Sequence, residues 1–349
     1  MSQYKPQWFE PLESISANVP IMVSIGDHEH EADHYYNYMK QEDFAGPEKE
    51  RYYSFKYGRV LFASVNSIYH SKKQLEWFDS LLSDAEKDSR IDWVIVYTHR
   101  PGHTENYPHG GEKYVQDHII PIMSKYSKSE ILTYGHSHAY ERGQVTDANF
   151  RLLQNGGGGA ELGRWKFDQD QQDYSEIQRT NDYWSYTIVD IDITNKKYEA
   201  KSYSLGNSDR IMNNELFDSF FRDKANETPP QKPIAITNGV QSYPILLRAS
   251  KYSGIYDILS SQFQVTSEKG NYNGFGVDCK RDFENIYFDS GAPDFIPIDK
   301  NRGVNLTKLL LKNIKFETGK EYWWRVRYRD KNLQWSEWSD EVLIITESK

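Results

Sequence analysis

The chain has 349 residues, more than one hydrophobic core usually serves, so we expect two domains. Its formal net charge of -9 argues against a protein that binds nucleic acid by neutralising phosphates. The single cysteine, Cys279, excludes an intrachain disulfide and a thiolate metal site. Because no apolar run is long enough to span a bilayer and residues 1–20 lack a long hydrophobic stretch, we expect neither a membrane span nor a signal peptide in this sequence.

The first part of the chain alternates between strand and helix patterns. Residues 19–25, 93–98 and 131–134 are short apolar runs that predict buried strands, and residues 52–57 and 60–65 predict a hairpin with a two-residue turn. Residues 74–87 and 114–124 have helical spacing, the second with a break near Pro121. This alternation predicts a layered α/β domain whose site opens at the carboxyl edge of its sheet.

The rest of the chain is strand-like. Residues 184–191 and 197–203 alternate, residues 168–176 predict an acidic loop, and the proline-rich residues 225–233 predict a stiff linker, which divides the chain into domains 1–228 and 229–349. Residues 322–329 alternate strictly, so their first, third, fifth and seventh side chains are expected to face a core: Tyr322, Trp324, Val326 and Tyr328.

All ten histidines lie within the first 138 residues, and several of them follow predicted strands directly. Asp27, His99, His136 and His138 stand just past three strand ends, where imidazole and carboxylate groups from distant segments can converge on a borderline metal ion. In an extended backbone His136 and His138 would point to the same side, so they could serve two adjacent metals. Two such cations suit in-line attack on a phosphoryl group.

These motifs resemble those of the calcineurin-like metallophosphoesterases, in particular the purple acid phosphatase group. Residues 26–29 (GDHE) resemble the family's G-N-H-E, residues 96–99 (VYTH) its V-x-x-H, and residues 135–142 (GHSHAYER) its G-H-x-H-x-Y-E-R. The resemblance covers about residues 10–205. It implies a layered α/β/β/α sandwich, incomplete at its amino end because the family's D-x-H and G-D-x-x-Y motifs do not precede residue 27.

The resemblance also implies roles for single residues. Asp27, His99 and His136 would bind one metal ion and His138 the other. His28 and His109 would lie beside the substrate phosphate, where either could protonate the leaving alkoxide, and His103 is an alternative for that role. A complete enzyme would use two ions of Fe, Zn or Mn and attack of metal-bound hydroxide on a small phosphomonoester, whereas this chain would hold at most one ion tightly. A phosphodiesterase of the same superfamily is the nearest alternative, and the family suggests a secreted or periplasmic location.

The chain departs from the family at two points. Asp27 replaces an asparagine, which adds negative charge and favours harder cations. The absent motifs leave three explanations open: an incomplete gene, a partner that supplies the missing strands, or a vestigial domain in a binding or scaffold protein. We favour the incomplete gene, because the surviving ligands are nearly intact.

The last domain carries a tryptophan motif. Residues 335–339 (WSEWS) match the W-S-x-W-S of cytokine receptor modules, which are fibronectin type III domains. We expect Arg325, Arg327 and Arg329 to stack on Trp335 and Trp338 and thereby to stabilise a fibronectin type III-like all-β sandwich. The ligand or partner of that domain is not indicated by the sequence.

Overall fold

The computed structural model describes residues 4–347 except 42–43, 107–109, 164–171, 274–275, 288–297, 313 and 315. The chain divides into two compact units, Met1–Tyr174 and Ser175–Lys349. These units are defined by compactness alone, and the domains 1–228 and 229–349 stay a prediction.

The first unit contains a mixed sheet whose strands follow the order β1-β2-β3-β4-β5-β7-β6. Its strands are β1 (Ala45–Gly46), β2 (Lys49–Tyr57), β3 (Val60–Ser64), β4 (Trp93–Tyr97), β5 (Ser129–Tyr134), β6 (Tyr140–Gln144) and β7 (Arg151–Asn155). Strands β3, β4, β5 and β7 are parallel, whereas β2 and β6 pair antiparallel to their neighbours. The predicted hairpin and the strands near residues 93 and 131 are therefore confirmed.

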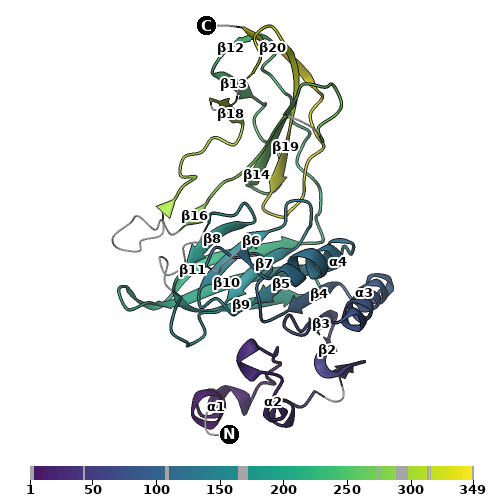
Figure 1. Cartoon of the computed structure of the whole chain (residues 1–349), viewed down its shortest axis with the longest axis vertical. Coiled ribbons are helices and arrows are strands. Elements are labelled where there is room, and N and C mark those ends of the chain that lie inside the picture. The colour runs from purple at the N-terminus through teal and green to yellow at the C-terminus, as the bar shows by residue number, and fades with distance from the viewer. Residues whose placement is uncertain are drawn as a thin grey trace. The chain divides into compact units, whose positions relative to one another are not determined.

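Helices cover this sheet over a common hydrophobic core. Helix α3 (Lys72–Lys87) begins after Ser71, whose hydroxyl oxygen caps it by accepting the N–H of Gln74 at 3.4 Å. A π-helical turn η5 (Val115–Ile119) runs into α4 (Ile120–Ser124), which has Pro121 near its start, so the predicted break is confirmed. Helices α3 and α4 lie beside β3, β4 and β5 (Figure 1), and buried residues of α3, η5 and α4 share one hydrophobic core with these strands. Within the described residues, no helix has the length and apolar character needed to cross a membrane.

The predicted strand over residues 19–25 is not formed. These residues lie between the amino-terminal helices η1 (Lys5–Phe9) and α1 (Glu10–Ser16) and the 3-10 turn η2 (Asp27–Glu29), which α2 (Asp33–Tyr38) follows. Among the described residues their backbone pairs with no strand: the N–H of Val19 donates to the carbonyl of Ile15 at 2.9 Å, and the carbonyl of Val23 accepts the hydroxyl of Tyr53 at 2.6 Å. The composition favours a strand, but a strand also needs a neighbour, and the described residues supply none.

The second unit consists of strands. Its strands are β8 (Ile177–Asn181), β9 (Trp184–Asp192), β10 (Lys197–Gly206), β11 (Ile211–Asp223), β12 (Gly239–Ser242), β13 (Ile245–Arg248), β14 (Ile258–Thr266), β15 (Gly276–Asp282), β16 (Ile286–Tyr287), β17 (Ile298–Asp299), β18 (Lys308–Leu311), β19 (Glu321–Asp330) and β20 (Val342–Glu347). One antiparallel sheet is β11-β10-β9, and separate sheets β12-β20-β19-β14-β15 and β13-β18 form a β-sandwich. The predicted class, a mixed α/β sheet with separate all-β sheets, is confirmed. Residues 225–233 form neither helix nor strand, as predicted for a linker, whereas residues 168–171 of the predicted loop lie outside the described part.

Strand β19 carries the predicted core and the predicted arginine ladder. Tyr322, Trp324, Val326 and Tyr328 are at most 3% exposed. On the other face the guanidinium of Arg325 lies 4.3 Å from the ring centre of Trp338, and that of Arg327 lies 4.1 Å from Trp335 and 4.6 Å from Trp338. Arg329 lies 5.4 Å from Trp335. The stacking prediction is therefore confirmed.

A buried asparagine anchors the start of the linker within the second unit. The side-chain oxygen of Asn332 accepts the N–H of Asp223 at 2.6 Å, and its amide donates to the carbonyls of Asp223 at 2.9 Å and Asn226 at 3.0 Å. Arg222 donates to the carbonyl of Asn332 at 2.7 Å. The end of β11 is thus held against the loop that follows β19.

Candidate metal centre

Two parallel strands bring two histidines to one edge of the sheet. β4 ends at Tyr97 and β5 at Tyr134, so His99 and His136 each follow their strand by two residues. The backbone pairing continues past the strand ends, because the N–H of Gly135 donates to the carbonyl of His99 at 3.1 Å. Asp27 reaches the same place from the turn η2.

The three side chains present one ligand atom each at mutual distances that suit a single ion. Nε2 of His99 lies 2.7 Å from Oδ1 of Asp27 and 3.1 Å from Nδ1 of His136, and the last two atoms are 3.4 Å apart. Ligands held at about 2.0–2.2 Å from one transition metal lie roughly 3.0–3.4 Å from each other. This donor set of two nitrogens and one oxygen therefore fits Fe, Zn or Mn.

The electrostatics of the cluster favour the metal-binding protonation states. Burial alone would raise the pKa of Asp27, but the neighbouring His136 and His99 outweigh it and lower that pKa. Burial also lowers the pKa of His99 and of His136, against the opposing effect of the Asp27 carboxylate. An ionised carboxylate and neutral imidazoles are the forms that bind metal ions.

The backbone at this site has one left-handed residue and two positions where only glycine fits. His136 has a φ of 66°, a left-handed conformation that is uncommon outside glycine and often marks functional sites. A Cβ on Gly26 would lie 2.6 Å from the Glu29 carboxylate, whose oxygen accepts the N–H of Gly26 at 2.7 Å. A Cβ on Gly156, the residue after β7, would lie 2.1 Å from the carbonyl oxygen of Ser137, so this close approach to the histidine motif requires glycine.

His28, His103 and His138, the other predicted site residues that the structure describes, do not join this cluster. His138 directs Nδ1 to the carbonyl of Glu161 at 2.5 Å, because the left-handed His136 prevents the extended geometry that would align the two side chains. His28 is exposed in the turn η2, and His103 is half-buried, with its carbonyl accepting the Tyr134 hydroxyl at 2.6 Å. His109 lies outside the described residues. The roles of His28, His103, His109 and His138 stay predictions.

An arginine lies beside the cluster and is held by three contacts. Nη2 of Arg100 is 3.9 Å from Oδ2 of Asp27, Nη1 is 2.8 Å from the carboxylate of Glu112, and its backbone N–H donates to the Ser67 hydroxyl at 2.8 Å. Ser67 follows the end of β3. Polar residues just past strand ends were the signal that selected His99, and the same signal would have selected Ser67. Arg100 therefore places a fixed positive charge next to the candidate ligands.

The glutamate of the GHSHAYER motif has a structural task. Glu141 is completely buried, and its Oε1 accepts the N–H groups of Glu105 at 2.9 Å and Asn106 at 3.1 Å. It thereby holds the loop that carries His103. Burial raises the pKa of Glu141 to about 7, while its hydrogen bonds act in the opposite direction.

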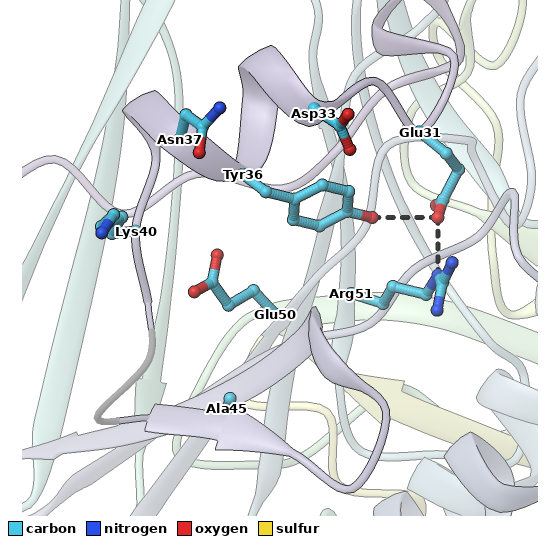
Figure 2. A pocket seen from close by; sticks show the side chains of 8 residues that line it. All are labelled: Glu31, Asp33, Tyr36, Asn37, Lys40, Ala45, Glu50 and Arg51. Carbon is cyan, nitrogen blue, oxygen red and sulfur yellow. Dashed lines mark hydrogen bonds and ion pairs between the residues drawn. The ribbon is translucent and has the colours of Figure 1, made fainter.

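The carboxylate of Glu31 forms a hydrogen-bond network, here called the Glu31 hub, that stabilises the segment after Asp27. The carboxylate of Glu31 accepts from the hydroxyl of Tyr36 at 2.9 Å, from Nε of Arg51 at 2.6 Å and from the amide of Asn66 at 3.0 Å. Figure 2 shows the first two side chains converging on Glu31 at the wall of a cavity of about 590 Å³. The cavity is also lined by Asp33, Asn37, Lys40, Ala45 and Glu50. The hub ties the turn that carries Asp27 to the end of β3.

The chain is similar in sequence to several known proteins. Residues 3–140 match the model of the family described as "Calcineurin-like phosphoesterase". Purple acid phosphatase 15 of Arabidopsis thaliana is 28% identical over 153 residues, covering 40% of this chain and 29% of that protein. A protein named "Probable inactive purple acid phosphatase 1", also from A. thaliana, is 24% identical over 244 residues, covering 58% of this chain and 39% of its own.

A solved structure gives the same result for the fold. The purple acid phosphatase PPD1 from yellow lupin (Lupinus luteus) seeds superposes with a TM-score of 0.51 at 18% identity, covering 64% of this chain and 43% of that one. Residues 3–140 are thus similar to calcineurin-like phosphoesterases, and the chain is distantly similar in sequence to purple acid phosphatases. The chain spans less than two fifths of the length of the curated relatives it matches.

Proposed function

We propose that this chain carries the site of a metal-dependent phosphoric ester hydrolase that acts on small phosphomonoesters. The observation that carries the proposal is the convergence of Asp27, His99 and His136 within 3.4 Å of one another, at the edge where parallel strands end. The family implies a phosphate ester as substrate.

The residues of the chain divide the work as follows. Asp27, His99 and His136 would hold one ion of Fe, Zn or Mn, and a bound ion would polarise the phosphoryl group and lower the pKa of a water molecule. Arg100, fixed by Glu112, offers its charge to the phosphate oxygens. His28 directly follows Asp27 in the sequence and would donate a proton to the leaving alcohol oxygen, and His103 and His109 are alternatives for this role.

The second candidate function is a binding or scaffold protein with a vestigial site. It is favoured by the small ligand set, since His138 is turned to a backbone carbonyl and the described residues bring three ligands together rather than two full sets. One of the matched relatives is itself named a probable inactive phosphatase.

Metal content and ester hydrolysis separate the two functions. We expect the chain, loaded with Mn²⁺, Zn²⁺ or Fe and then desalted, to retain at most about one ion per chain and to lose it in the His99→Ala variant. We expect a chromogenic phosphomonoester to be cleaved faster than the matching diester. Retained metal without hydrolysis of either ester, both in the chain as given and in a version with added D-x-H and G-D-x-x-Y segments, would favour the vestigial function. Faster diester cleavage would favour a phosphodiesterase.

A further inference from the structure

A cavity of about 590 Å³ lies within the second unit and is lined by residues of β8, β11, β16 and β17. β16 pairs with β8 through Ile286 and Arg179, and it pairs with β17 through Ile286 and Asp299. A volume of this size is typical of sites that hold small molecules. The candidate metal ligands lie in the first unit, so this cavity is not part of that centre.

Two exposed arginines on the cavity wall lack a carboxylate partner. Nη1 of Arg210 donates to the hydroxyl of Tyr183 at 3.5 Å, and within the described part of the chain neither Arg210 nor Arg302 forms an ion pair. The described lining residues include a single carboxylate, Asp299, whose Oδ1 already accepts two backbone N–H groups at 2.9 and 3.0 Å. Two positive charges are therefore available to a ligand.

A third arginine, Arg179, fixes one wall of the cavity. Its Nη1 donates to the carbonyl of Phe217 at 2.6 Å, and its Nη2 donates to the carboxylate of Glu284 at 3.0 Å. Its Nε lies 3.4 Å from Oδ1 of Asp218. The guanidinium thus ties β8 to β11 and to the residues just before β16. A wall held in this way needs little rearrangement when a ligand binds.

The rest of the wall combines an unpaired amide oxygen with apolar side chains. Asn181 is 4% exposed, and its Oδ1 forms no hydrogen bond within the described residues. A buried acceptor without a partner is costly, so a ligand that donates a hydrogen bond here would be stabilised. Met212, Phe217 and Ile286 supply apolar surface for the body of such a ligand.

We propose that this cavity binds a small organic dianion, either a phosphate monoester or a dicarboxylate, whose charges meet Arg210 and Arg302. Guanidinium groups match the geometry of carboxylate and phosphate oxygens, and two unpaired guanidiniums match a double negative charge. The apolar body of the ligand would pack on Met212 and Phe217. The proposal does not depend on the proposed function, because the lining residues belong to the second unit.

Calorimetric titration of the whole chain tests the proposal with two dianions that share one ring. Phenylphosphonate and phenylmalonate are the probes, at about pH 8 and with a chelator that removes metal ions. Benzoate supplies the same ring with a single negative charge, and phenyltrimethylammonium supplies it with a positive charge. We expect at least one dianion to bind saturably and more tightly than benzoate, and the cation not to bind. The tighter of the two dianions tells whether the natural ligand is a phosphate or a dicarboxylate.

Variants locate the binding site. Arg210→Gln and Arg302→Gln should each weaken binding of the tighter dianion at least about tenfold, because each removes a charge-assisted contact. Both side chains are exposed, so these variants should keep the urea midpoint of the wild-type chain. Arg248→Gln, at an exposed position on β13, is the matched control and should bind like the wild type, as should His99→Ala.

Four results would overturn the proposal. These are failure of both dianions to bind, binding of benzoate or of the cation as tight as that of the dianions, and binding by the Arg210 and Arg302 variants that equals that of the control. The fourth is loss of binding in His99→Ala, since the dianion would then occupy the candidate metal centre.

Discussion

The buried carboxyl of Glu141 makes the stability of the first unit depend on pH in a predictable way. Its pKa is about 7 in the folded chain against an ordinary value of 4.5, because burial disfavours the charged form. Between these two values the folded state keeps a proton that the unfolded chain has lost. The free energy of unfolding should therefore fall as pH rises through this window.

The size of the effect follows from the shift. A difference of roughly 2.5 pKa units at about 1.4 kcal/mol per unit gives about 3 kcal/mol at most, all of it lost between pH 4.5 and about 7. The Glu141→Gln variant cannot titrate, while its side-chain oxygen can still accept the N–H groups of Glu105 and Asn106. The wild-type chain should thus lose up to about 3 kcal/mol relative to the variant across this window.

Urea unfolding at a series of pH values measures this difference, with the fluorescence of the tryptophans as the signal. Glu76→Gln, at an exposed position on α3, is the matched control and should show a flat difference. A carbon NMR titration of the Glu141 carboxyl gives its pKa directly. The reasoning is refuted if the difference between wild type and Glu141→Gln stays constant from pH 4.5 to about 7, or if it grows with pH.

Three further results are expected. Adding Mn²⁺ or Zn²⁺ at about 100 times its Kd should raise the free energy of unfolding by about 2.7 kcal/mol, and His99→Ala should abolish this gain while His34→Ala, at an exposed position, should keep it; an equal gain in both would contradict the site. Trp338→Ala removes the ring under two arginines of β19 and should cost about 1–2 kcal/mol in urea unfolding, so an unchanged midpoint would speak against the ladder. Asn332→Ala removes the buried side-chain hydrogen bonds to Asp223 and Asn226, so it should lower the free energy of unfolding by about 2–3 kcal/mol and speed proteolysis of residues 225–233. Unchanged cleavage there would show that these hydrogen bonds do not hold the linker.

The sequence predicted the elements whose signal is local. Helix α3 and strands β2 to β5 follow from the spacing of their own apolar residues, and His99 and His136 meet because parallel strands end at one edge. The arginine ladder of β19 also follows from strict alternation. In each case the helices and strands concerned are specified by a pattern within their own residues.

The sequence-based expectations differ from the structure where an element depends on contacts with residues outside that element. Residues 19–25 have a strand composition, but strand formation requires a neighbour that the described residues do not provide. The alignment of His136 with His138 assumed an extended backbone, and the φ of 66° at His136 is not visible in the residue types. Both partners of Glu141 lie 35 or more positions away, and Glu31 binds Arg51 and Asn66 at 20 and 35 positions, so no local pattern could have indicated these roles.

The left-handed backbone at His136 also limits how this site can be altered, in evolution or in the laboratory. Asparagine and aspartate tolerate that conformation better than most residues and can still offer an oxygen to a metal ion, whereas β-branched residues would be strained there before any question of metal binding arose. A library of variants at this position would therefore be sorted first by backbone geometry and only then by ligand chemistry. Very few amino acids at position 136 could therefore change the metal preference of this centre without straining its backbone.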